Sequence, residues 1–170
     1  MDITQLILDD HYEQRRLFAI LDQIPDDNTA ALGMVWRRLS TFLGTHAKAE
    51  EKLFYPRLLA DGQAGGEGNE AKSETKDAIK DHNEIRDAIA AVGKNRTGSP
   101  EWRKAVQAVN KANGDHMAEE EREGLTLFRQ KATLTERHDL AVAFISFEIE
   151  HLEGVTPANP DPERWVEQHG

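Results

Sequence analysis

The sequence of 170 residues contains no cysteine. This absence excludes structural disulfides, thiolate catalysis, iron–sulfur clusters and zinc sites that depend on cysteine. Any bound metal ion must therefore be held by imidazole, carboxylate or phenolate groups.

Basic residues and long apolar runs are also scarce. The 21 Lys and Arg are outnumbered by 31 Asp and Glu, which gives a formal net charge of −10. That balance argues against nucleic acid and against an anionic membrane surface as partners. No run reaches the ~18 apolar residues of a membrane span, and the N-terminal residues lack the basic region of a signal peptide. The composition therefore predicts an acidic, soluble, cytoplasmic domain.

The sequence does contain strong helical periodicity. Apolar residues recur at helical spacing over five segments, about 2–24, 29–56, 70–92, 99–131 and 133–152, with a loop at 61–69. Asp2, Ser99 and Thr133 stand where N-caps belong. We predict an all-α fold: an antiparallel up-down four-helix bundle with an appended fifth helix and an extended C-terminal tail. The bundle is predicted over residues 1–132, and residues 133–170 are predicted to pack on the same domain.

A short pattern of histidine and acidic residues occurs twice. The segment DHYEQR at 10–15 matches DHNEIR at 81–86, and HAKAEEK at 46–52 matches HMAEEER at 116–122. The repeat distances are 71 and 70 residues, counted between matching histidines. The pattern predicts two helical hairpins, each with one lone histidine and one His-x-x-x-Glu.

The phase of these residues predicts a metal centre inside the bundle. Each histidine shares a helix face with apolar residues one or two turns away, and so do the two glutamates. Buried carboxylates are costly without a compensating cation, and bound metal ions would supply that compensation. The predicted ligands are His11, His46, Glu50, His82, His116 and Glu120. We expect the first two histidines to bind one metal and the other two a second, with both glutamates bridging. Iron suits such donors, and manganese or zinc are alternatives.

At these residues the chain resembles the hemerythrin-like, or HHE cation-binding, family, over about residues 3–131. The resemblance implies a four-helix bundle around two iron ions with an oxo or hydroxo bridge. Oxygen-carrying members have a further histidine where this chain has Arg86, and their fourth-helix carboxylate would correspond to Glu121. Glu121 therefore stays an alternative to Glu120. Fewer histidines imply more open irons, which favours reaction with peroxide, dioxygen or nitric oxide over reversible oxygen carriage.

Further residues have two interpretations each. Tyr55 is a candidate phenolate ligand, but ideal helical phase places it opposite His46 and favours a packing role. Arg15 and Arg86 could line the pocket and steer anions, although pairing with surface acids is favoured. The single Glu148-x-x-His151 lacks the second copy that a ferritin-type site requires. His138 and His151 are therefore predicted to lie on the surface.

Two classes of function are consistent with such a centre. The favoured class is an enzyme, a catalase- or peroxidase-like protein that removes hydrogen peroxide or uses dioxygen. The alternative is a binding module that senses oxygen, nitric oxide or iron without turnover. A bundle without metal is a third class, and a protein partner or a homo-oligomer is left open.

Overall fold

The computed structural model describes all 170 residues and contains helices and connecting turns but no strands. The elements are α1 (Ile3–Gln23), α2 (Thr29–Ala49), the π-helix η1 (Glu50–Phe54), α3 (Tyr55–Gly65), α4 (Gly68–Val92), α5 (Pro100–Arg122), α6 (Gly124–Lys131), α7 (Leu134–Glu150) and α8 (Pro162–His169). The predicted all-helical architecture is confirmed. None of these helices combines the length and the apolar character that crossing a membrane requires.

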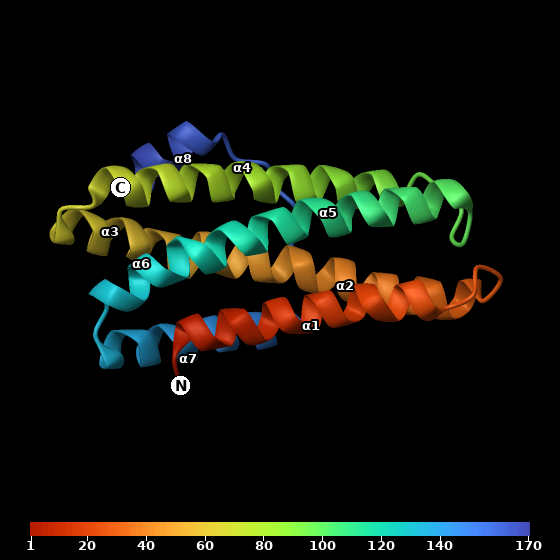
Figure 1. Cartoon of the computed structure of the whole chain (residues 1–170), viewed down its shortest axis with the longest axis horizontal. Helices are drawn as coiled ribbons and strands as arrows, with labels where there is room; N and C mark the ends of the chain where they lie inside the picture. Colours follow the sequence, from red (N-terminus) through yellow and green to blue (C-terminus); the bar gives the residue numbers. More distant parts are fainter.

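Four long rods run along the longest axis of the molecule (Figure 1). They are α1, the continuous α2–η1–α3, α4, and α5–α6. α1 packs against α2, α4 packs against α5, and contacts between α1 and α5 and between α2 and α4 join the two hairpins. α7 lies against α1 and α2, whereas α8 lies against α4.

Side-chain caps fix where several helices begin. Asp2, Ser99 and Thr133 each accept a hydrogen bond from a backbone N–H in the first turn of the helix after them. Thr133 also forms a reciprocal capping box with Glu136. Each such cap stabilises its helix by about 1 kcal/mol. The sequence-based positions of these three caps are confirmed.

The apolar core is divided into two clusters by a polar layer. One cluster of 18 buried residues includes Phe54 and Phe128, and the other, of 10, includes Trp102. Each rod contributes residues to both clusters and carries one histidine of the repeated pattern between those two stretches. The histidines therefore meet in one layer with apolar packing above and below, which excludes water and fixes their side chains.

The predicted loop at 61–69 is wrong over most of its length. α3 continues to Gly65, because Leu58, Leu59 and Gly62 face the core and bury the helix. The helix ends at Gly66, whose φ of 88° lies in the left-handed region that glycine adopts without strain. Only residues 66 and 67 then separate α3 from α4.

The prediction of an extended tail is wrong for residues 162–169, which form α8. The Asp161 side chain accepts a hydrogen bond from the Arg164 N–H, and Pro162 occupies the first helical position, where its fixed φ suits a helix. Trp165 and Val166 point into the larger core cluster and hold the helix in place. Proline therefore starts a helix in this tail instead of preventing one.

Candidate metal centre

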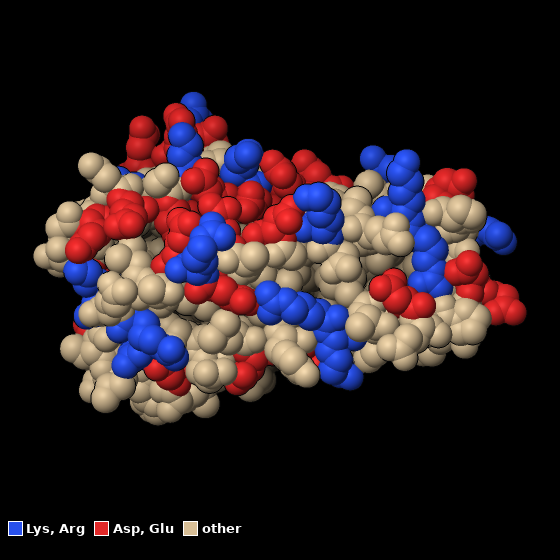
Figure 2. Space-filling view, in the orientation of Figure 1, with Lys and Arg blue, Asp and Glu red and all other residues tan.

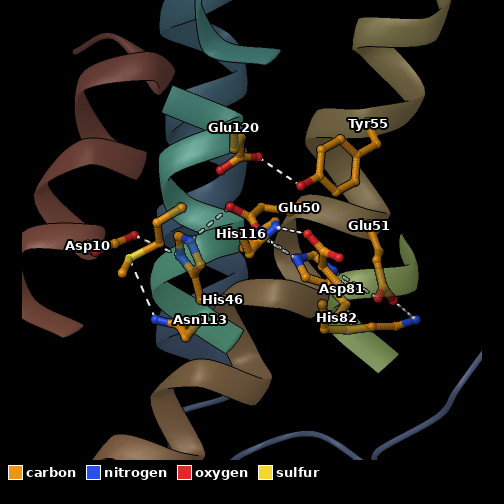
Figure 3. Close-up of polar contacts among 12 residues, drawn as sticks. Asp10, His46, Glu50, Glu51, Tyr55, Asp81, His82, Asn113, His116 and Glu120 are labelled. Atoms are coloured by element: carbon orange, nitrogen blue, oxygen red, sulfur yellow. Dashed lines mark hydrogen bonds and ion pairs between the residues drawn. The ribbon is translucent and has the colours of Figure 1, made fainter. Parts of the chain in front are cut away.

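Four histidines surround the carboxylate of Glu50 in the polar layer. Figure 3 shows three of them, His46, His82 and His116, beside Glu50. His46 Nε2 lies 2.8 Å from Glu50 Oε1, and His11 Nε2 lies 3.9 Å from the same oxygen. On the other side, His82 Nε2 is 3.1 Å and His116 Nε2 is 4.0 Å from Glu50 Oε2. Each oxygen of one carboxylate thus faces one pair of histidines.

These side chains are buried, and several of their inward atoms lack hydrogen bonds. None of the five residues is more than 4% exposed. The Nε2 atoms of His11 and His46 and both oxygens of Glu50 have no hydrogen-bond partner in the protein. Buried polar atoms are normally paired, because an unpaired one loses its hydration without compensation. Two groups, His11–His46–Glu50 and Glu50–His82–His116, place one ligand atom per residue within 4.8 Å of each other. Imidazole and carboxylate donors in such groups fit divalent metal ions.

Without a cation, the charges of this layer balance internally. Burial opposes the charged form of His82, but the nearby carboxylates of Glu50 and Glu51 raise its pKa to about 9. Burial likewise opposes ionisation of Glu50, yet the positive charges of His46 and His82 close to its oxygens hold its pKa well below the usual range. Metal ions would therefore take the place of protons on the histidines.

The outer nitrogens of two histidines face acids from the opposite hairpin. His11 Nδ1 lies 3.0 Å from Glu121 Oε1, and His82 Nδ1 lies 3.2 Å from Glu51 Oε1. Both acids directly follow the glutamate of a His-x-x-x-Glu motif. A carboxylate at Nδ1 favours the tautomer that carries its proton there, so that the Nε2 lone pair is directed inward.

Each of these acids is held by an arginine. Arg15 Nη2 donates to Glu121 Oε1 at 2.7 Å, and Arg86 Nη2 donates to Glu51 Oε1. Each arginine follows its histidine by four residues. Arg15 forms the expected surface ion pair, whereas Arg86 pairs with a buried acid, contrary to the expectation. Neither arginine contacts the inward atoms of the histidines; both fix the carboxylates that orient them.

The other two histidines face aspartates from their own hairpin. His46 Nδ1 lies 3.3 Å from Asp10 Oδ2, and His116 Nδ1 lies 3.8 Å from Asp81 Oδ2. Glu148 of α7 adds a second carboxylate, with its Oε1 3.6 Å from His46 Nδ1. The repeated Asp-His pairs of the sequence thus place each aspartate beside the histidine of the neighbouring helix.

Glu120 is buried in the same layer but lies to one side. Its Oε2 is 3.3 Å from His11 Nε2, and its Oε1 accepts a hydrogen bond of 2.8 Å from the Tyr55 hydroxyl. No ring nitrogen of His82 or His116 lies within 4.0 Å of its carboxylate oxygens. The structure therefore brings Glu120 beside the first pair of histidines and not between the pairs. Glu121 lies further out, at the outer nitrogen of His11.

Tyr55 reaches Glu120 because of the π-helix η1. The Tyr55 N–H bonds to the carbonyl of Glu50, five residues earlier, so the turn contains one residue more than an α-helical turn. The extra residue rotates the next turn of the helix, so that Tyr55 faces the polar layer. Tyr55 therefore does more than the packing role that ideal helical phase predicted. Burial, together with the nearby carboxylates Glu120 and Glu50, raises the pKa of Tyr55 well above its usual value. The phenol therefore stays protonated and donates its hydrogen bond.

Glu148 is, with the other outer acids Asp10, Glu51 and Asp81, a residue at the site that sequence reasoning missed. It is 8% exposed, and it extends the apolar face of α7 formed by Ala141 and Phe144. The same helical-phase argument that predicted the histidines would have found it. His151 is half-buried and stacks on Phe147, which departs from the predicted surface position, whereas His138 is exposed as predicted.

Comparisons with known proteins identify the family. The sequence model of one protein family, the hemerythrin HHE cation-binding domain, matches residues 2–128. No curated protein and no solved structure gave a match. The matched segment contains all four histidines and both glutamates of the polar layer. The chain therefore belongs to the hemerythrin HHE cation-binding family.

Proposed function

We propose that this protein holds two iron ions and removes hydrogen peroxide by catalase- or peroxidase-like turnover, with dioxygen as a further small ligand. The observation that carries the proposal is the position of Glu50, whose two oxygens each face one pair of histidines. A carboxylate placed in this way suits two cations far better than one.

The proposed ligands divide between the two ions. His11 and His46 would hold one ion and His82 and His116 the other, with Glu50 shared and Glu120 added beside His11. Two iron ions held this way supply two-electron redox chemistry, which matches the balanced reaction of two hydrogen peroxide molecules to one dioxygen and two water molecules. Six protein ligands for two ions leave room for a small reactant.

The residues around the ligands would orient them and control protons. The outer carboxylates fix the histidine tautomers. Tyr55, protonated and buried, is a hydroxyl donor at the edge of the site. A neutral donor of this kind can stabilise negative charge on a small oxygen species without adding a competing cation.

A cavity supports access for small molecules. It has a volume of about 860 Å³ and is lined by α1, α2 and α7 residues that include Asp10 and Glu148. Both residues face the outer nitrogen of His46. The cavity therefore ends one side chain away from the polar layer.

The proposal includes the finer architecture. We interpret the four rods as an up-and-down four-helix bundle with α7 appended, and residues 1–132 as the metal-binding unit on which residues 133–170 pack. Short turns between consecutive rods and the contacts of α7 with α1 and α2 support this interpretation.

Metal content and peroxide turnover test the function. Protein expressed with iron supplied and purified in air is expected to contain two irons per chain and to release dioxygen from added peroxide. His82→Ala should lose iron and activity, whereas His138→Ala, an exposed histidine on α7, should retain both. Less than about one iron per chain in the wild type would contradict the two-iron proposal.

A sensor is the second candidate because one residue of the appended helix α7 contacts a proposed ligand. Glu148 belongs to α7 and faces His46, so a change at that histidine would be transmitted to α7. If the protein is a sensor, peroxide or nitric oxide will change hydrogen exchange in α7 without continuous dioxygen release. Turnover with unchanged exchange in α7 would favour the enzyme.

A further inference from the structure

A second group of carboxylates lies outside the polar layer, between α4 and the junction of α5 and α6. It consists of Glu74, Glu119 and Glu123, whose ligand atoms lie within 4.8 Å of one another. Glu119 and Glu123 are four residues apart and share a helix face, while Glu74 faces them from α4. Acidic side chains gather over this part of the molecule (Figure 2).

Glu74 has no basic partner that would explain its burial. It is only 6% exposed, yet its close polar neighbours are other carboxylates. Burial and these neighbouring carboxylates, Glu120 first among them, raise its pKa to about 8. A carboxylate buried among other carboxylates is stabilised when a cation binds.

The group connects the surface with the metal centre. Glu123 is exposed and Glu119 is half-buried, whereas Glu74 is 6% and Glu120 only 1% exposed. Arg122 bonds to one oxygen of Glu123 and leaves the other free. Each residue in this series is thus more buried than the one before, and the last is a proposed metal ligand.

Gly124 lies between the side chains of Glu74 and Glu120. A Cβ atom at this position would lie 3.0 Å from Glu74 Oε1 and 3.5 Å from Glu120 Cγ. The missing side chain therefore leaves the space beside both glutamates clear. A Cβ at this position would require the Glu74 carboxylate to shift by a few tenths of an ångström.

We infer that Glu74, Glu119 and Glu123 form a cation-capture site that delivers divalent metal to the buried centre through Glu120. The inference rests on the proposed function, because it assumes that the histidine layer is the destination. The carboxylates along this path are hard oxygen donors, which bind divalent cations and exchange them readily. The net charge of −10 adds a general attraction for cations, and the clustered glutamates focus it at one point.

Metal uptake by the metal-free full-length protein tests the inference with cobalt(II) as the probe. The visible absorption of cobalt bound to histidines reports filling of the buried centre, and stopped-flow mixing gives its rate. Glu74→Gln, and separately the double variant Glu119→Gln/Glu123→Gln on the exposed rim, are expected to slow filling by about tenfold or more without changing the final amplitude. Glu84→Gln, an exposed acid of α4 outside the cluster, is the matched control and should fill at the wild-type rate.

The outcomes separate the two proposals. If the wild type shows no histidine-bound cobalt spectrum, the proposed metal centre fails, and the capture site fails with it. If the wild type fills but all variants fill at its rate, only the capture site is overturned. A lower final amplitude with an unchanged rate would also overturn it, because Glu74 would then be a ligand and not a step in delivery.

Discussion

The two hairpins have matching outer carboxylates but different inner ones. In both, an aspartate faces the histidine of the neighbouring helix, and the acid directly after the motif glutamate faces the lone histidine of the other hairpin. The inner glutamates differ: Glu50 faces all four histidines, whereas Glu120 faces His11 and bonds to Tyr55.

The residues after each motif account for the difference. After Glu50 the chain forms a π-helix and reaches Tyr55, while the matching position after Glu120 is Leu125, beyond an interruption of the helix at Glu123. Only the first hairpin therefore supplies a phenol, and that phenol holds Glu120 to one side. A duplicated pattern can thus keep the orientation of the histidines symmetric while the shared carboxylate comes from one half alone.

The strongest test of this asymmetry exchanges each inner carboxylate for its amide. Glu50→Gln should abolish stoichiometric binding at both metal positions, because each Glu50 oxygen serves one pair of histidines. Glu120→Gln should reduce occupancy beside His11 only. Iron content by elemental analysis gives the comparison, and equal losses in the two variants would remove the distinction between the hairpins.

Exchange of the outer acids should have a smaller effect. Glu51→Gln and Glu121→Gln leave every proposed ligand in place. They weaken the contacts that orient the imidazole rings of His82 and His11, a change that typically lowers metal affinity ~10–100-fold. Glu51 should be the more costly of the two, because it is 1% exposed and Glu121 is 28% exposed. Competition with a chelator measures both affinities. A larger loss for Glu121→Gln would show that burial does not set the contribution of these acids.

The pH dependence should differ between the metal-free and metal-bound protein. His82 has a pKa of about 9 when folded, against 6.5 for an ordinary histidine, so its contribution to stability is complete below pH 6.5 and is lost as the pH rises through 9. The free energy of unfolding of the metal-free protein, measured with urea, should therefore fall over that range. The fall should be less steep in Glu51→Gln. Metal affinity should change in the opposite direction, by up to about tenfold per pH unit for each proton displaced. Metal affinity that stays constant between pH 6.5 and 9 would contradict the proton balance inferred for the centre.

The smallest effect is expected at the phenol. Tyr55→Phe leaves Glu120 Oε1 buried without its donor, which should lower the free energy of unfolding of the metal-free protein by ~1–3 kcal/mol. Tyr12→Phe, at a tyrosine that is 71% exposed, is the matched control and should leave it unchanged. Equal stability of the two variants would mean that the Tyr55 bond does not hold Glu120.

Helical phase correctly predicted that the four histidines point into the bundle, where the helices are regular. All four histidines lie in one layer because each stands in phase with apolar residues that flank it in both core clusters. Phase failed for Tyr55, where one additional residue in η1 rotates the chain. Pro56, the next residue, was the available signal. A proline has no N–H to donate to the carbonyl four residues earlier, so it often marks an irregular turn in a helix.

Contacts between elements that are distant in sequence could not be predicted from local pattern. Arg86 was expected to pair with surface acids, and no role was predicted for Glu51, but the packing of α2–η1 against α4 buries both beside His82. α8 was missed because its three nearby prolines suggest an extended chain, while Trp165 gains its burial only from the larger core cluster. Tertiary packing decided these cases.

Anomalous diffraction from crystals of the iron-loaded protein, collected at the iron edge, tests the central claim most directly. The account predicts two peaks, one beside His11 and His46 and one beside His82 and His116, with the Glu50 carboxylate between them. A single peak, or peaks away from Glu50, would contradict it.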